Sequence, residues 1–317
     1  MSVRTYYDPV HLGITLDTQD PVESLLMELI DSIPFQRLRR IRQLGPASLT
    51  FHGAESSRFT HSLGVFQVSR RALNKLIRSN SDLKNFKHIL FASALLHDLG
   101  HGPLSHTSEG IFGLKHEEWS AKLIKEHPAI YKPLENFSKG CSDQIANLIN
   151  GINNPNRAIK SLITSQLDCD RLDYLLRDSY STGTKYGLLD LERILAALTI
   201  SPDGELAINP KGIIAVEHYL VTRNIMYRSI YNHRLNEVSN WLLENIFKIA
   251  RNLGPQKVWA DKSMFKWIWE KEKIDMETFL ANDDIVTNYH LSRWKDSDIK
   301  ILSNLCSRYI NRNLFKA

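Results

Sequence analysis

A histidine and an aspartate, His97 and Asp98, stand side by side in the segment LLHDLGHGPLSH at residues 95–106. Imidazole and carboxylate groups both bind borderline divalent metals, and the glycines that follow leave room for a substrate to approach the backbone. On its own, such a pair is more often a hydrogen bond between two buried polar groups. The segment therefore predicts a polar site at the end of an apolar helix, and a metal there needs further ligands.

Two other segments contain suitable ligands. His61 lies in RFTHSLGV, and Asp170 lies in DCDRLDY. On a helix, Asp170, Tyr174 and Asp178 are spaced four residues apart and share one face. A surface helix with Asp–Arg pairs is the alternative interpretation of this spacing. Two neighbouring carboxylates also remain alternatives to Asp170, namely Asp168 and Asp173.

The order of these segments resembles the HD superfamily, which is named after the dyad and whose all-helical fold gathers four ligands around a metal. The phrases RFTHSLGV, LLHDLGHGPLSH and DRLDYLLRDS resemble in particular its dGTPase-like branch, the deoxynucleoside triphosphate triphosphohydrolases, and the resemblance extends from about Asp8 to about His233. It implies a divalent metal (Fe, Mn, Co, Ni or Zn), with Mg or Mn on the triphosphate. The implied metal ligands are His61, His97, Asp98 and Asp170.

The resemblance also implies a pocket for a dNTP substrate. It assigns arginines to the triphosphate, because guanidinium forks suit phosphate oxygens, although relatives often have Lys where Arg171 stands. An aromatic ring under C2′ would exclude a ribose hydroxyl, and Gln and Asp would hydrogen-bond the 3′-OH. Asn232 is shorter than the Gln of some relatives, so base preference stays open; Arg223, Tyr227 and Tyr231 could also be an ordinary amphipathic stripe. The implied substrate contacts are Gln43, Leu44, Arg58, Arg171, Tyr174, Asp178, Arg223, Tyr231 and Asn232.

Histidines after the dyad suit the proton transfer that hydrolysis at the α-phosphorus requires. A metal would activate the attacking water, and an imidazole would protonate the departing 5′ oxygen. The resemblance places His101 on the phosphate but leaves the identity of the acid open. Glu109 stands where relatives often have Asp, so its hydrogen bond is expected to be displaced. The catalytic candidates are His101, His106, Glu109 and His116.

The segment DSIPFQRLRR matches positions with which regulated relatives bind a guanine nucleotide: Asp31, Gln36 and Arg39. The resemblance thus implies an activating GTP or dNTP and a homo-oligomer, either a dimer or a tetramer. The same residues could cap and solvate an ordinary helix, since polar residues precede Pro34. Tyr7, where those relatives carry Asn, counts against regulation.

Two other functions would use the same residues. HD sites hydrolyse many phosphoesters, and a net charge of +5 with a pI near 9.0 favours anionic partners, so a phosphodiesterase or nuclease is one alternative and nucleic acid an optional partner. The sequence lacks the extensions typical of cyclic dinucleotide and alarmone hydrolases. The second alternative is a nucleotide-sensing module with weak catalysis, against which the intact ligand set argues.

Helices must position these residues. Polar stretches near 78–86, 136–143 and 150–157 predict loops, and the run LTISPDGELAI, around 199–209, predicts the one β-hairpin. Four arginines at 37, 39, 40 and 42 spread around a helix, which is typical of a solvated face. Apolar residues at three- and four-residue spacing predict helices near 22–32, 35–43, 61–78, 87–98, 117–126, 143–150, 157–167, 170–179, 190–199, 211–233 and 235–252.

The expected fold is therefore an all-α HD-domain helical bundle with one small hairpin, comprising a core at 1–235 and a short helical C-terminal extension at 236–317 packed on it. The chain of 317 residues is 43% apolar and 24% charged, as in folded proteins. Without a signal peptide or an apolar run of about 18 residues, a cytoplasmic protein with no membrane contact is expected. Cysteines without CxxC spacing predict buried, reduced thiols: Cys141, Cys169 and Cys306.

Overall fold

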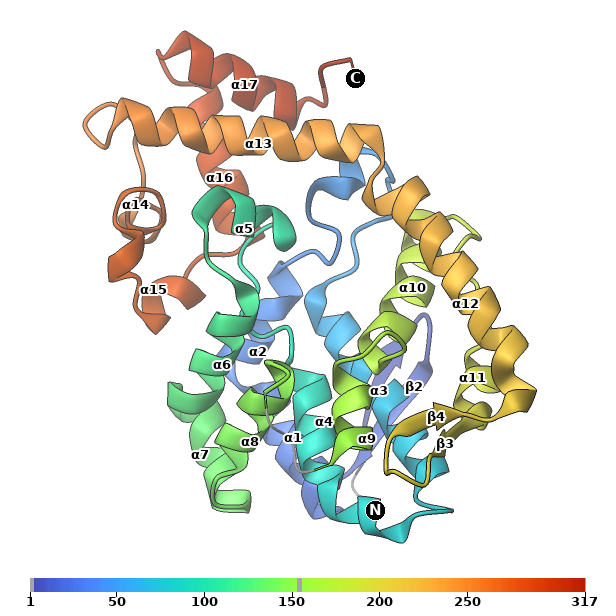
Figure 1. Ribbon diagram of the computed structural model, residues 1–317. Helices are drawn as coiled ribbons and strands as arrows, with labels where there is room; N and C mark the ends of the chain where they lie inside the picture. The colour runs from blue at the N-terminus through green and yellow to red at the C-terminus, as the bar shows by residue number, and fades with distance from the viewer. Residues whose placement is uncertain (1–2, 153–155, 317) are drawn as a thin grey trace.

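Two helices, α3 (Arg58–Leu76) and α4 (Lys87–Leu96), form the centre of the fold in the computed structural model, which describes residues 3–152 and 156–316. Every side chain of α4 from Ile89 to Leu96 is buried, because the helix is apolar on all sides. Helix α10 (Cys169–Thr182) packs against α3, and α8 (Cys141–Ile149) packs against α4. The segments predicted to carry the chemistry thus lie on adjacent central helices (Figure 1).

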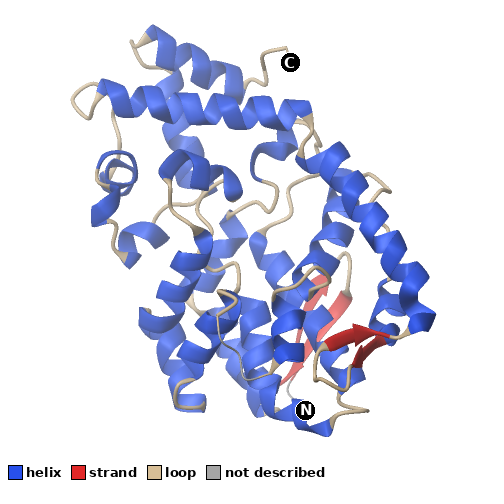
Figure 2. Cartoon of the chain, in the orientation of Figure 1, coloured by secondary structure: helices blue, strands red, loops and turns tan. Residues whose placement is uncertain are grey.

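The other helices surround this pair, and helix is the dominant structure throughout (Figure 2). Short helical turns at 38–40, 45–49, 81–86, 210–212, 227–231 and 271–273 join several of them. In chain order the surrounding helices are α1 (Pro21–Asp31), α2 (Ile33–Arg37), α5 (His106–Phe112), α6 (His116–Glu126), α7 (Pro128–Phe137), α9 (Arg157–Ile163), α11 (Leu191–Ala197), α12 (Ile213–Met226), α13 (Arg234–Leu253), α14 (Lys262–Trp269), α15 (Met276–Leu280), α16 (Asp284–Lys295) and α17 (Lys300–Ile310).

The C-terminal part is helical, as expected, and contacts the rest of the chain. Helix α13 buries one face that includes Leu243 and Phe247, and it packs on α5 and α17. The ring of Phe279, on α15, stacks on Trp119 of α6 with centroids 4.0 Å apart. The expected division between a core and an extension at residue 235 remains a prediction.

Within residues 3–152 and 156–316 there are two antiparallel hairpins, where the sequence predicted one. The predicted hairpin is β3 (Leu198–Ile200) with β4 (Leu206–Ile208), and the other is β1 (Val3–Asp8) with β2 (Leu12–Asp17). The prediction of a single hairpin was therefore wrong. The signal on β2 is short, since only Ile14 and Leu16 alternate with more exposed residues and bury their side chains.

The helix predicted over 35–43 ends early, because α2 stops at Arg37, a 3-10 turn covers 38–40, and residues 41–43 are not helical. The prediction of a solvated arginine face is also wrong at Arg37. This side chain is fully buried and donates hydrogen bonds to the carbonyls of His101 and Asn282. Helices α5 and α7 were not predicted.

Several other expectations can be compared with the structure. The three cysteines are buried thiols, as predicted. The predicted loop at 150–157 lies partly outside the described residues, and the one at 78–86 contains a 3-10 turn. Over 3–152 and 156–316, no helix combines the length and apolarity needed to cross a bilayer.

Candidate metal centre and substrate pocket

Side chains from α3, the end of α4 and α10 converge on one point. His61 Nε2 lies 3.0 Å from Asp170 Oδ1, 3.3 Å from His97 Nε2 and 3.5 Å from Asp98 Oδ2. His97 Nε2 lies 3.4 Å from Asp98 Oδ1. Ligand atoms held about 2.1 Å from one cation stand about 3.0–3.4 Å apart, so this cluster is consistent with a divalent metal site.

The hydrogen bonds of the two histidines also fit metal binding. His97 Nδ1 lies 2.9 Å from the carbonyl oxygen of Ala94, which can only accept, so Nδ1 carries the proton. His61 Nδ1 lies 2.7 Å from Asp173 Oδ2. In the neutral rings, both Nε2 lone pairs therefore point at the cluster, as in metal-bound histidines whose other nitrogen is held by an acceptor.

Asp173 supports His61 from behind. It is fully buried, lies 2.6 Å from His11 Nε2 and accepts a hydrogen bond of 2.8 Å from Arg177, which also contacts Asp8. Burial would raise the pKa of Asp173, but Arg177 and the hydrogen bonds from His11 and His61 hold it well below its ordinary value. The sequence reasoning missed His11 and Arg177 as supporting residues, and the only signal in the sequence is that the resemblance begins near Asp8.

The three candidate aspartates of α10 have different positions. Asp168 caps the helix, accepting from the backbone N–H of Arg171 and pairing with its guanidinium. Asp173 faces α3, where Gly64 permits its approach, since a Cβ on Gly64 would stand 1.9 Å from Asp173 Oδ1. Asp170 lies on the Nε2 side of both histidines, with its Oδ1 3.0 Å from His61 Nε2 and 3.7 Å from His97 Nε2.

A pocket of about 360 Å³ opens beside the cluster. Its lining includes three of the four predicted metal ligands, with His61 the exception. It also includes the three histidines predicted to be catalytic and most of the predicted substrate contacts. Its lining residues are Gln43, Leu44, Arg58, His97, Asp98, His101, His106, His116, Asp170, Arg171, Tyr174, Asp178, Tyr227 and Tyr231.

Two arginines of the pocket are held in fixed positions. The buried Arg58 donates to Asp98 Oδ2 over 2.6 Å and to Ser105 Oγ over 2.9 Å. Arg171 pairs with Asp168 and donates to the carbonyl of Ser165 over 2.7 Å. Both guanidinium groups are therefore oriented before any anion binds.

Hydrogen-bond acceptors and tyrosines line another part of the pocket. Tyr231 donates to Asp178 Oδ2 over 2.9 Å, and its ring meets that of Tyr174 edge-on at 5.9 Å. Burial raises the pKa of Asp178 to about 7. In the described part of the chain, Asp178 Oδ1 and Gln43 Oε1 are buried without a hydrogen-bond partner. Buried acceptors of this kind are rare unless a ligand or water satisfies them.

The catalytic candidates form a second polar cluster. Glu109 Oε1 lies 2.7 Å from His116 Nδ1 and 3.1 Å from His106 Nδ1, and His101 stacks on His116 at 3.9 Å. Burial would raise the pKa of Glu109, but the hydrogen bonds from His106 and His116 lower it to about 2. Ligand atoms of the four residues lie within 4.8 Å of one another, so an anion or a cation could bind between the rings.

The remaining predicted residues lie outside the pocket lining. Arg223 Nη1 donates to Gln166 Oε1 over 2.7 Å, and Asn232 is exposed. Of the predicted regulatory residues, Asp31 and Arg39 are exposed and Gln36 is half-buried. Asp31 pairs with Arg4 at 2.7 Å, and Arg39 Nε donates to Gln36 Oε1 over 2.8 Å.

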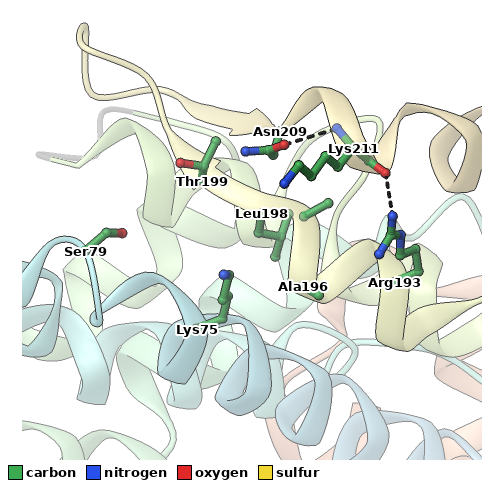
Figure 3. Close-up of a pocket in the computed structure, with 9 residues that line it drawn as sticks. Lys75, Ser79, Arg193, Ala196, Leu198, Thr199, Asn209 and Lys211 are labelled. Atoms are coloured by element: carbon green, nitrogen blue, oxygen red, sulfur yellow. Dashed lines mark hydrogen bonds between the residues drawn. The ribbon is translucent and has the colours of Figure 1, made fainter.

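A separate cavity of about 290 Å³ lies between the C-terminal part of α3, helix α11 and the β3–β4 hairpin (Figure 3). Three basic residues line it, Lys75, Arg193 and Lys211, together with Thr199 and Asn209. Arg193 donates to the backbone carbonyl of Lys211 over 3.0 Å. None of the residues that the sequence predicted as functional is among its lining residues.

Known proteins resemble this chain along nearly its whole length. The HD domain family model matches residues 58–178, and the model of an HD-associated region matches residues 189–317. An uncharacterized protein of Bacillus subtilis, YwfO, is 37% identical over 99% of this chain and 71% of its own length. A phosphohydrolase of Bacteroides thetaiotaomicron of known structure is 31% identical, with a TM-score of 0.88 over 99% of this chain and 78% of its own. The chain belongs to the HD-domain family and has its phosphohydrolase fold.

More distant relatives have assigned activities. A Dictyostelium discoideum protein named deoxynucleoside triphosphate triphosphohydrolase SAMHD1 homolog is 25% identical over 93% of this chain. The chain spans only 57% of that relative, and 59% of an uncharacterized Methanocaldococcus jannaschii protein, MJ1154, to which it is 35% identical.

Proposed function

We propose that this chain hydrolyses deoxynucleoside triphosphates to deoxynucleoside and triphosphate. The observation that carries the proposal is the convergence of His61, His97, Asp98 and Asp170 beside a pocket lined by oriented arginines and by buried acceptors without partners. The SAMHD1-like relatives support the same substrate class.

The four convergent residues would hold a divalent cation. The bound cation would polarise an α-phosphate oxygen and activate a water molecule. Arg58 and Arg171 bind the phosphates. Because Asp98 and Asp168 already hold their guanidinium groups, little reorganisation is needed when the substrate arrives.

The sugar lies against Tyr174 and Leu44 in this proposal. The tyrosine ring leaves no room for a 2′-hydroxyl, and the 3′-OH donates its one hydrogen bond to either Gln43 Oε1 or Asp178 Oδ1, the two free acceptors. A substrate without that hydroxyl would leave this acceptor buried and unpaired, which carries a large penalty.

The departing 5′ oxygen takes its proton from His106 or His116. Glu109 contacts Nδ1 of both rings, so their Nε2 atoms point away from the carboxylate and can hold the proton. A carboxylate whose pKa is about 2 stays ionised, so Glu109 can accept a hydrogen bond from the Nδ1–H of either ring.

Regulation and assembly are finer parts of the proposal. Asp31, Gln36 and Arg39 would bind an activating GTP or dNTP. Helix α12, at the outer edge of the molecule in Figure 1, exposes 81% of Ile214 and 57% of Val221, which suits a contact between copies of the chain.

Product analysis tests the proposed reaction. The purified protein would be incubated with each dNTP, each NTP and single-stranded DNA, in Mn²⁺ or Mg²⁺. We expect inorganic triphosphate and the deoxynucleoside from dNTPs, with little turnover of NTPs. Shortened DNA would instead indicate a nuclease, and binding without products would indicate a sensing module; either result rejects the proposal.

A further inference from the structure

A single carboxylate of the C-terminal region contacts two segments of the pocket wall. Asp284, the first residue of α16, is buried, and its Oδ1 accepts from the backbone N–H of Leu104 over 2.7 Å. Its Oδ2 accepts from the backbone N–H of Arg42 over 2.9 Å. Both residues lie close in sequence to the pocket lining: Gln43 and Leu44 directly follow Arg42, and His106 comes two residues after Leu104.

The Leu104 segment needs such support. Leu104 has a φ of 63° and Ser105 a φ of 55°. Residues other than glycine adopt positive φ values only at an energetic cost. The conformation persists where surrounding contacts enforce it, and the bond from Leu104 to Asp284 is one of these contacts.

Ser105 transmits this geometry to the predicted phosphate site. Its hydroxyl donates to the carbonyl of Arg42 over 2.5 Å and accepts from Arg58 Nε over 2.9 Å. Arg58 in turn donates to Asp98. Asp284 is therefore connected to Arg58 through Leu104 and Ser105, and to Gln43 through Arg42.

Helix formation does not explain the buried carboxylate. The preceding residue, Asp283, already caps α16, accepting from the N–H groups of Ile285 and Val286 over 3.0 and 3.1 Å. Burial raises the pKa of Asp284 to about 6, even though its carboxylate accepts two backbone hydrogen bonds. Burying the ionised carboxylate therefore lowers the stability of the folded protein.

We infer that Asp284 is a positioning residue of the substrate pocket: its carboxylate holds the Arg42 and Leu104 segments so that Gln43, Leu44 and Arg58 keep the geometry that binds substrate. The inference rests on the proposed function for the identity of that substrate. Asp284 itself contacts neither the metal ligands nor the pocket lining, so its effect passes through the backbone of these two segments.

The test compares Asp284→Asn with Asp283→Asn. An amide has one acceptor oxygen, so Asp284→Asn keeps the side-chain size but loses one of the two backbone hydrogen bonds. Asp283→Asn changes the same helix start and the ion pair with Arg40, but the Asp283 side chain bonds only to Arg40, Ile285 and Val286 in the described part of the chain, none of which lines the pocket. It therefore serves as a control for a general loss of stability.

Amide hydrogen exchange is measured first, because it does not depend on activity. We expect faster exchange at residues 101–106 and 41–45 in Asp284→Asn, with little change there in Asp283→Asn. Equal exchange in these segments for the wild type and Asp284→Asn overturns the inference. This holds even if the wild type hydrolyses no dNTP, a result that would reject the proposed function separately.

Steady-state kinetics follow for the active protein. Asp284→Asn should raise KM for a dNTP about tenfold, the effect of one lost charge-assisted hydrogen bond, and reduce the preference for dNTP over NTP. Metal content should stay at the wild-type level. A change in KM and in sugar preference that Asp283→Asn reproduces would show a structural effect only and would overturn the inference.

Discussion

His61 Nδ1 lies 2.7 Å from a carboxylate oxygen of Asp173. Asp173, which the sequence left as an alternative to Asp170 for the role of metal ligand, therefore orients the predicted ligand His61. Asp173 is itself held by His11 and Arg177, from the N-terminal hairpin and α10. The geometry of the candidate metal site therefore depends on contacts well outside the His-Asp dyad.

Replacing Asp173 with Asn should weaken metal binding about 10- to 100-fold, because the amide orients His61 less strongly and removes a buried charge that Arg177 requires. Metal titration of the purified variant measures this. Asp168→Asn is the matched control on the same helix, since Asn also caps helices well and Asp168 does not contact His61. Equal affinities in the two variants would contradict the support that we assign to Asp173.

Replacing both His97 and Asp98 with Ala should abolish turnover together with metal binding. His106→Ala should lower turnover about 10²- to 10⁴-fold, the usual contribution of a general acid, while the metal stays bound. Turnover and metal content measured on the same samples separate the two effects. Full activity without His97 and Asp98 would defeat the proposed mechanism.

Tyr174→Ala should reduce the preference for dNTP over NTP, because the space under the sugar is then open to a 2′-hydroxyl. The ratio of kcat/KM for dGTP and GTP should fall at least tenfold. Tyr174→Phe keeps the ring and should keep the ratio. If Tyr174→Ala retains the wild-type ratio, the ring does not select the sugar.

Asp178 makes stability depend on pH, because burial raises its pKa from 3.8 to about 7. Between about pH 4 and pH 7, the folded protein holds a proton that the unfolded chain has lost, so the free energy of unfolding falls as the pH rises through this window. Each pKa unit corresponds to about 1.4 kcal/mol as an upper limit.

Urea denaturation of the metal-free protein across this window measures the effect. Asp178→Asn cannot titrate there and should show a smaller fall. Asp168 and Asp284, whose pKa values are each raised to about 6, affect the pH dependence of both proteins equally. The difference between the pH profiles of the wild type and Asp178→Asn therefore reports on Asp178. Identical pH profiles would mean that Asp178 titrates normally in the folded protein.

The exposed face of α12 predicts self-association. Ile214→Asp with Val221→Asp should shift the protein to a smaller species in light scattering after size exclusion, because charges in an apolar contact oppose association. Ile301→Asp, at a residue of α17 that is 57% exposed, is the control and should change nothing. A wild type that is monomeric at all concentrations would remove the proposed contact.

Local spacing decided much of this protein from its sequence. Asp170, Tyr174 and Asp178 recur every fourth residue, so any helix over this segment presents them together, and all three line the pocket. The apolar periodicity likewise predicted the central helices, including the buried α4. These features depend on the helical repeat alone, which a sequence displays directly.

Tertiary packing decided the rest. Asp168, Asp170 and Asp173 are the same chemical group within one turn and a half of helix, and only the position of α3 determines which of them faces His61 Nε2 and which faces Nδ1. The burial of Arg37 and the bridge made by Asp284 depend on contacts between residues that are 245 and 180 positions apart along the chain. Such contacts leave no periodic pattern, because each results from the way distant segments meet in the folded chain.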